Sequence, residues 1–131
     1  MIPARALIAD DSRVFRAWMG ELLRERGFEV VEAGDGREAL DLTLSQRPTL
    51  VVLDALMPLM SGFDVLTKMR EKVPDYRPVV FMVTAVYKSR RWEAEARQQH
   101  QVQEYLEKPL EETTVLTALA RHLPELFPPT S

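Results

Sequence analysis

Leu50-Val51-Val52-Leu53-Asp54 is a run of four apolar residues that ends in a carboxylate. Such a run, with two β-branched residues in it, is typical of a strand that is buried on both faces of a sheet. After Gly62, apolar residues recur at spacings of three and four residues as far as Val73, which predicts a helix. The segment therefore predicts a strand followed by a helix, with Asp54 at the carboxyl end of the strand.

The same alternation of short apolar runs and longer helical patterns extends over the whole chain. Alternating strands and helices predict an α/β protein of the (βα)₅ type, in which a doubly wound parallel five-stranded sheet carries helices on both faces. Gly27 and Pro48 are expected to end the first two helices, and Asp35 is expected to cap the second. The predicted strands are 6–9, 28–33, 50–53, 78–83 and 102–106, and the predicted helices lie at about 14–26, 35–47, 62–73, 89–100 and 116–123.

The composition fits one soluble globular domain. The chain has 131 residues, of which 46% are hydrophobic and 28% are charged, so it can bury a core without disulfides. It contains no cysteine, which excludes thiolate metal sites and cysteine nucleophiles and fits a reducing compartment. The net charge of -3 does not favour nucleic-acid binding, which would need a local basic face, so we expect no direct contact with nucleic acid by this domain. No segment is apolar enough to serve as a signal peptide or to span a membrane, so we expect a cytoplasmic location.

We expect the domain to cover residues 1–124, with 125–131 as a flexible tail or the start of a linker.

Polar side chains gather at the predicted carboxyl ends of the strands. Asp10 and Asp11 follow the first strand, Asp54 ends the third, Thr84 follows the fourth and Lys108 follows the fifth. In an open α/β sheet the carboxyl ends of the strands meet at one edge, where ligands bind. We therefore expect three carboxylates, one hydroxyl and one ammonium group to converge there.

Three carboxylates in one crevice repel each other. At about 4 Å and an effective dielectric constant near 20, each pair costs roughly 4 kcal/mol, so a proton or a cation must offset the repulsion. Lys108 can neutralise only part of this charge. Because all the candidate ligands are oxygen atoms, Mg²⁺ or Mn²⁺ is favoured over Zn²⁺. The set suits phosphoryl chemistry, in which the metal and Lys108 hold phosphoryl oxygens while Asp54 attacks as the nucleophile.

These residues, taken in order, resemble the response-regulator receiver domain of two-component signalling, of the chemotaxis-regulator type. Asp10-Asp11-Ser12 is similar to the family's acidic pair for Mg²⁺, and the segment 53–62, LDALMPLMSG, is similar to its phosphoacceptor motif. Thr84-Ala85 looks like the switch threonine with its small neighbour. The segment 105–109, YLEKP, matches the aromatic switch residue and the lysine with its proline. The resemblance covers residues 6 to about 123 and implies the flavodoxin-like strand order 2-1-3-4-5.

The resemblance implies a phosphorylation site and its partners. A histidine kinase or a phosphotransfer protein would donate a phosphoryl group to Asp54. Mg²⁺ would be held by Asp10 or Asp11, by Asp54 and by the backbone carbonyl of Leu56. Such a domain is a signalling switch in a phosphorelay, and it is not a turnover enzyme beyond catalysing its own phosphorylation and dephosphorylation.

The resemblance also implies how the signal leaves the site. Thr84 would move to bond a phosphoryl oxygen, and Tyr105 would turn inward to fill the space that Thr84 leaves. The face built from the predicted helix 89–100, the strand 102–106 and the last helix would then change, and a protein partner would read it. The sequence leaves open whether phosphorylation also drives formation of a homodimer. The bond between Lys108 and Pro109 is commonly cis in this family.

The chain departs from the family pattern between Thr84 and Lys108. This stretch is slightly longer than usual, and Gln101-Val102 stands where the family has a glycine-alanine turn. A basic cluster, Lys88, Arg90 and Arg91, lies beside the expected site. Two residues beyond Asp54 and Thr84 stand the apolar residues Leu56 and Val86, and our hypothesis is that they exclude the attacking water and make the phosphoryl group long-lived.

Three other functions are open to such a sequence. A phosphatase of the haloacid-dehalogenase type needs a second acid two residues after its nucleophile, where this chain has Leu56. A flavodoxin needs a glycine- and hydroxyl-rich phosphate loop after the first strand, where Asp10 and Asp11 would repel a phosphate. A pseudo-receiver that docks partners without phosphorylation is the remaining alternative, and the complete acidic set argues against it.

Overall fold

The computed structural model describes residues 4–85, 94, 97–98 and 101–126. These residues form strands and helices that alternate along most of the chain, as the sequence predicts. The strands are β1 (Arg5–Ala9), β2 (Glu29–Ala33), β3 (Leu50–Asp54), β4 (Val79–Thr84) and β5 (Glu104–Glu107), and the helices are α1 (Arg13–Glu25), α2 (Gly36–Gln46), α3 (Gly62–Lys72) and α5 (Glu112–His122).

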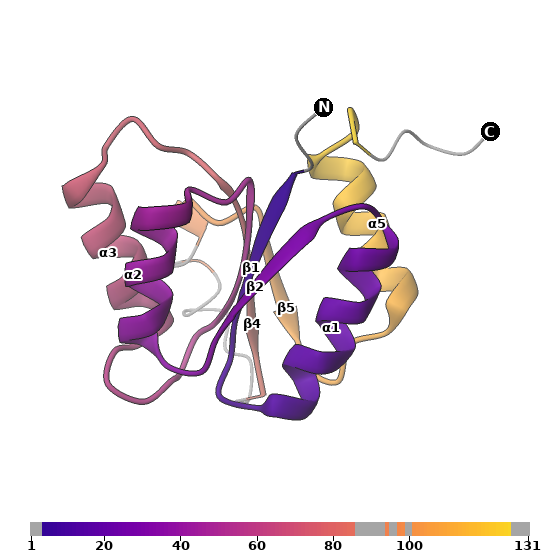
Figure 1. Cartoon of the computed structure of the whole chain (residues 1–131), viewed down its shortest axis with the longest axis horizontal. Helices are drawn as coiled ribbons and strands as arrows, with labels where there is room; N and C mark the ends of the chain where they lie inside the picture. Colours follow the sequence, from indigo (N-terminus) through magenta and orange to yellow (C-terminus); the bar gives the residue numbers. More distant parts are fainter. Residues whose placement is uncertain (1–3, 86–93, 95–96, 99–100, 127–131) are drawn as a thin grey trace.

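The strands form one parallel sheet at the centre of the molecule (Figure 1). Their order in the sheet is β2-β1-β3-β4-β5. The predicted fold class and strand order are therefore confirmed. Because the chain reverses its direction of winding after β2, the carboxyl ends of β1 and β3 lie next to each other and form the switch point where α/β proteins bind their ligands.

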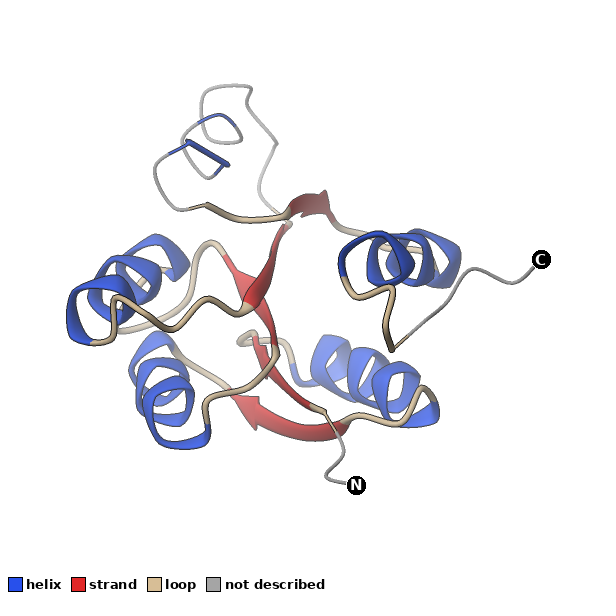
Figure 2. Cartoon of the chain, turned by 90° about the horizontal axis from the view of Figure 1, so that it is seen from above, coloured by secondary structure: helices blue, strands red, loops and turns tan. Residues whose placement is uncertain are grey.

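Helices cover both faces of the sheet (Figure 2). Successive side chains of a strand point to opposite faces, so Leu7 packs with residues of α2 and α3, whereas Ile8 packs with residues of α1 and α5. Both side chains are fully buried, and all five residues of β3 are buried as well. The continuous apolar run that predicted β3 thus reflects burial on two faces rather than on one.

The helices begin at capping side chains. Ser12, Asp35 and Ser61 accept hydrogen bonds from backbone N–H groups three residues later, at 3.2, 2.8 and 3.1 Å. The predicted cap at Asp35 is therefore confirmed. Gly27 follows α1 with a φ of 92°, a left-handed conformation that favours glycine, as its predicted place at a helix end requires.

The largest difference from the predicted strand boundaries is at the start of β5, and the other strand ends differ by at most one residue. β5 begins at Glu104 rather than at Val102, because Val102 is buried by packing against the core and not by pairing with β4. The preceding residue, Gln101, has a φ of 56°, so a side-chain-bearing residue adopts the left-handed conformation here.

Several predictions fall on residues that the structure leaves out of its description. Val86, Lys88, Arg90 and Arg91 lie outside the described residues, as do most of the predicted helix 89–100 and residues 127–131 of the predicted tail. Among the helices that are described, none has the length and apolar character needed to cross a membrane.

Candidate functional site

The parallel register brings the predicted site residues to one edge of the sheet. Ala9 pairs with Leu53, and Asp54 pairs with Val83, so Asp10 and Asp54 leave adjacent strands at nearly the same level. Thr84 pairs with Glu107, which places Lys108 just beyond the end of β4. The predicted convergence of the strand ends is what the structure shows.

Three carboxylates form the centre of the site. One oxygen each from Asp10, Asp11 and Asp54 lies within 4.8 Å of the others. Asp10 is fully buried and Asp54 is 6% exposed, whereas Asp11 is exposed. Backbone N–H groups orient the two buried acids: that of Ser12 donates to Asp10 Oδ1 at 2.8 Å, and that of Leu56 donates to Asp54 Oδ1 at 3.1 Å.

Lys108 enters the same cluster from the end of β5. Its Nζ lies 2.5 Å from Asp10 Oδ2 and 3.9 Å from Asp54 Oδ2, and its side chain is 15% exposed. The backbone N–H of Lys108 donates to the carbonyl of Thr84 at 2.9 Å, which ties the lysine to the end of β4. The Lys108–Pro109 bond is cis, as the resemblance implies.

The charges of the site do not cancel. Burial, and after it the neighbouring Asp10 carboxylate, raise the pKa of Asp54 from 3.8 to about 6, although the Leu56 N–H and Lys108 act in the opposite direction. The cluster thus carries more negative charge than Lys108 offsets. Among the described residues, the candidate ligands are three carboxylate oxygens with no histidine or cysteine beside them, a set that fits a hard divalent cation such as Mg²⁺.

Two glycines fix the loop after Asp54. A Cβ at position 62 would overlap the carbonyl oxygen of Asp54, and a Cβ at position 36 would overlap that of Met60. The backbone N–H of Gly62 donates to Ala55 at 2.9 Å, so the loop folds back over the end of β3. Leu56 is 45% exposed in this loop, next to the acidic cluster.

The two predicted switch residues are both buried. Thr84 is fully buried at the end of β4, and Tyr105 is 2% exposed within the core cluster on the α2–α3 side. The ring of Tyr105 already lies inside the molecule, so the structure shows the inward position alone. The turn from an outward to an inward position on phosphorylation stays a prediction. The structure brings Thr84 to the site by its place in the sheet, and its predicted movement is likewise untested.

The sequence reasoning missed two residues of α1. The ring of Phe15 lies under the Lys108 ammonium, with Nζ 4.3 Å from the ring centroid. Arg16 Nη1 donates to the backbone carbonyl of Asp10 at 2.7 Å, and its Nε pairs with Glu32 at 3.1 Å. The one signal that could have indicated them is the Ser12 cap, which places both in the first turn of α1 beside the acidic pair.

This geometry agrees with the comparison to known families. A family model described as the response regulator receiver domain matches residues 6–120. The chain belongs to this family. Among solved structures, the chemotaxis protein CheY4 of Vibrio cholerae is 30% identical, with a TM-score of 0.82 over 92% of this chain and 98% of that one. A CheY-like receiver domain of Methanospirillum hungatei JF-1 gives a TM-score of 0.83 at 25% identity, over 95% of this chain and 97% of that one.

Curated relatives are response regulators of several kinds. The transcriptional regulatory protein PdtaR of Mycobacterium tuberculosis is 43% identical over 72 residues, which are 54% of this chain and 35% of the relative. Sporulation initiation phosphotransferase F of Bacillus subtilis is 35% identical over 85 residues, 65% of this chain and 67% of the relative. The match thus spans only about a third of the length of PdtaR.

The chain is therefore the receiver domain of a two-component response regulator. Receiver domains are signalling switches rather than turnover enzymes. They generally bind Mg²⁺ at an acidic pocket, and response regulators partner with histidine kinases or phosphotransfer proteins.

Proposed function

We propose that this receiver domain accepts a phosphoryl group on Asp54 from a histidine kinase or a phosphotransfer protein. The observation that carries the proposal is the juxtaposition of a buried Asp54 carboxylate with two further carboxylates and the Lys108 ammonium. Three carboxylates held this close repel one another, which costs free energy. A docking module that works without phosphorylation would gain no function in return for this cost.

The oxygen donors of the cluster fit Mg²⁺, with Mn²⁺ as the second choice. Asp10, Asp11, Asp54 and the backbone carbonyl of Leu56 would hold the ion. When bound, it would offset the negative charge of the carboxylates and of the incoming phosphoryl oxygens. The ordering of Asp10 and Asp54 by the N–H groups of Ser12 and Leu56 supports this assignment, because one oxygen of each carboxylate is fixed in place. The second oxygen of Asp10 contacts Lys108 Nζ at 2.5 Å, so the ion would share this oxygen with the lysine or displace it.

Asp54 is proposed as the nucleophile. Its carboxylate oxygen forms a bond to phosphorus while the bond from phosphorus to the histidine nitrogen of the donor breaks, and that nitrogen keeps the electron pair. A pKa of about 6 leaves Asp54 ionised at neutral pH and makes its oxygen more basic than that of an ordinary carboxylate. Lys108 and the Thr84 hydroxyl are the groups proposed to hold phosphoryl oxygens.

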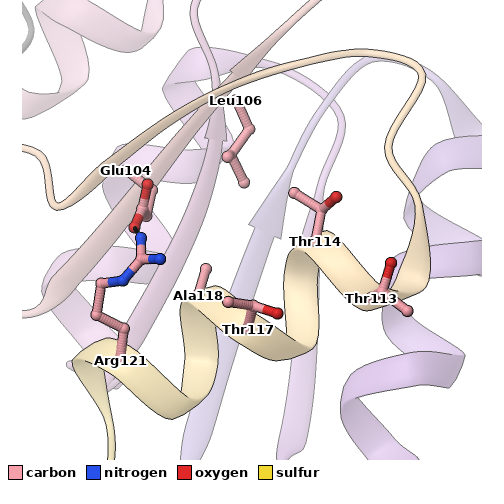
Figure 3. Close-up of a pocket in the computed structure, with 7 residues that line it drawn as sticks. All are labelled: Glu104, Leu106, Thr113, Thr114, Thr117, Ala118 and Arg121. Carbon is pink, nitrogen blue, oxygen red and sulfur yellow. Dashed lines mark hydrogen bonds and ion pairs between the residues drawn. The ribbon is translucent and has the colours of Figure 1, made fainter.

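The output is proposed to leave through the face that contains β5 and α5. This face has a hollow of about 290 Å³ beside the buried Glu104, which pairs with Arg121 at 2.6 Å (Figure 3). The lining residues come from both elements: Glu104, Leu106, Thr113, Thr114, Thr117, Ala118 and Arg121. A downstream protein partner would read a change in this face after Thr84 and Tyr105 respond to the phosphoryl group, and a second copy of the chain could do so as a homodimer.

The remaining assignments follow from the same proposal. We propose residues 1–124 as the receiver domain, a cytoplasmic location, and no direct contact with nucleic acid or membrane by this domain. The apolar side chain of Leu56, half-exposed at the site, is proposed to hinder the attack of water on the phosphoryl group.

A titration followed by Trp18 fluorescence tests the proposal. Trp18 lines a groove together with Lys108 and Pro109, so it is placed to report events at the site, and a Trp92→Phe background makes it the single tryptophan. We expect beryllium fluoride, a phosphoryl mimic, to bind only when Mg²⁺ is present and not at all in Asp54→Asn. If the wild type binds neither Mg²⁺ nor the mimic, the domain works as a pseudo-receiver and the proposal is wrong.

A further inference from the structure

We infer that Phe15 is a positioning residue whose aromatic face holds the Lys108 ammonium over the phosphoacceptor site. The inference rests on the proposed function, because it assigns the group that keeps Lys108 ready for a phosphoryl oxygen.

The contact has the geometry of a cation–π interaction. Lys108 Nζ lies 4.3 Å from the centroid of the Phe15 ring, well inside the roughly 6 Å limit of such contacts. The lysine side chain is only 15% exposed, so its ammonium is largely desolvated and the attraction is less screened than at an open surface.

The ring itself is held from two sides. The backbone N–H of Phe15 donates to Ser12 Oγ at 3.2 Å, which fixes this residue in the first turn of α1. Its ring packs against Trp18, with ring centroids 6.0 Å apart and a tilt of 47°. Since α1 starts directly after the acidic pair, the same cap that begins the helix also aims the ring at the site.

Lys108 needs a contact that positions its ammonium group and leaves the N–H groups available to donate to a phosphoryl oxygen. It reaches the site on a flexible four-carbon stem, and within the described part of the chain its ammonium hydrogen-bonds to Asp10 alone, at 2.5 Å. A divalent cation among the carboxylates would compete for that same Asp10 oxygen and repel the ammonium. The attraction between the ring face and the ammonium does not fix the direction of the N–H groups. Lys108 can therefore replace its hydrogen bond to Asp10 by one to a phosphoryl oxygen and still stay in the site.

Fluorination of the ring tests the inference with almost no change of shape. Mono-, di- and trifluorinated phenylalanine at position 15 progressively remove negative charge from the ring face. We expect the dissociation constant of beryllium fluoride at saturating Mg²⁺ to rise stepwise along the series, by about threefold to tenfold in total. Phe15→Tyr should stay near the wild-type value, and Phe15→Leu should weaken binding about as much as the trifluorinated ring. The matched control is the same series at Phe28, a buried ring just before β2, where we expect no trend.

A second readout does not depend on phosphorylation. The ring current of Phe15 should move the NMR signals of the Lys108 ε-methylene protons upfield in the metal-free protein, and the shift should persist in Phe15→Tyr and vanish in Phe15→Leu. Binding of the mimic with a flat fluorination series would overturn the inference and leave the proposed function intact. Failure of the wild type to bind the mimic, with the upfield shift present, would overturn the proposed function and leave Phe15 with only a packing role.

Discussion

Replacing Asp54 by asparagine is expected to stabilise the metal-free protein, although it removes the proposed phosphoacceptor. The Asp54 carboxylate is 6% exposed and lies beside Asp10 and Asp11, so its charge is unfavourable in the folded state. Asparagine has nearly the same shape, and its side-chain oxygen can still accept the hydrogen bond from the Leu56 N–H. Lys108 keeps Asp10 as its partner at 2.5 Å.

The size of the effect follows from the pKa of Asp54. Burial and the Asp10 charge raise it from 3.8 to about 6, which corresponds to a penalty of about 2 to 3 kcal/mol for the ionised form. Because the folded-state pKa lies above the unfolded one, the folded state binds the proton more tightly. The wild type therefore loses stability as the pH rises from about 4 to about 6, while the variant does not. The advantage of Asp54→Asn should be near zero at pH values below 4 and complete above pH 6.

Urea unfolding in a metal chelator, over a series of pH values, measures this difference directly. We expect the free energy of unfolding of Asp54→Asn to exceed that of the wild type by about 2 to 3 kcal/mol at neutral pH, a rise in Tm on the order of 10 °C. The matched control, Asp41→Asn on the exposed side of α2, should change it by less than about 0.5 kcal/mol. An Asp54→Asn variant that is less stable than the wild type at neutral pH, or an advantage independent of pH, would refute the electrostatic account of the site.

Other predictions concern the neighbouring loop and the output face. Leu56→Asn should shorten the lifetime of the phosphorylated domain, measured by loss of radiolabel; an unchanged lifetime would show that Leu56 does not shield the phosphoryl group. Gly62→Ala should lower the free energy of unfolding by more than about 2 kcal/mol, because its Cβ would overlap the Asp54 carbonyl, whereas Gly34→Ala meets only the end of an arginine side chain and should cost much less. Glu104 is buried, which by itself raises its pKa, but hydrogen bonds from His122 and Arg121 outweigh burial and hold the pKa below its usual value. Glu104→Gln should therefore destabilise the protein at neutral pH, and the penalty should shrink as the pH falls through the pKa of Glu104; a pH-independent penalty would contradict this.

Much of the fold could be predicted because its signals are local. The apolar run at β3 is continuous in the sequence, although the contacts that bury it come from distant elements. The helix ends at Asp35 and Gly27 depend on a hydrogen bond three residues away and on a single backbone angle. The start of β5 was predicted wrongly because Val102 is apolar and buried, and sequence patterns report burial rather than strand pairing.

The site was predictable to the extent that sheet topology places it. Asp10, Asp54 and Lys108 each stand at a strand end, and a parallel sheet necessarily brings strand ends together. Phe15 could not be identified, since its helical spacing is the same for a packing residue as for one that contacts an ammonium group. The burial of Glu104 could not be predicted for a related reason. Its carboxylate is paired with Arg121 and His122, and these side chains come next to it because α5 packs beside β5 in the folded chain.

The most direct test of the central claim is to incubate the protein with Mg²⁺ and a small-molecule phosphoryl donor and to locate the product by mass spectrometry. Borohydride converts an aspartyl phosphate to homoserine, so peptide mapping after reduction identifies the acceptor residue. The account predicts one added phosphoryl group, dependence on Mg²⁺, homoserine at position 54, and no product in Asp54→Asn. Absence of phosphorylation in the folded wild type, or a phosphoryl group at another residue, would contradict it.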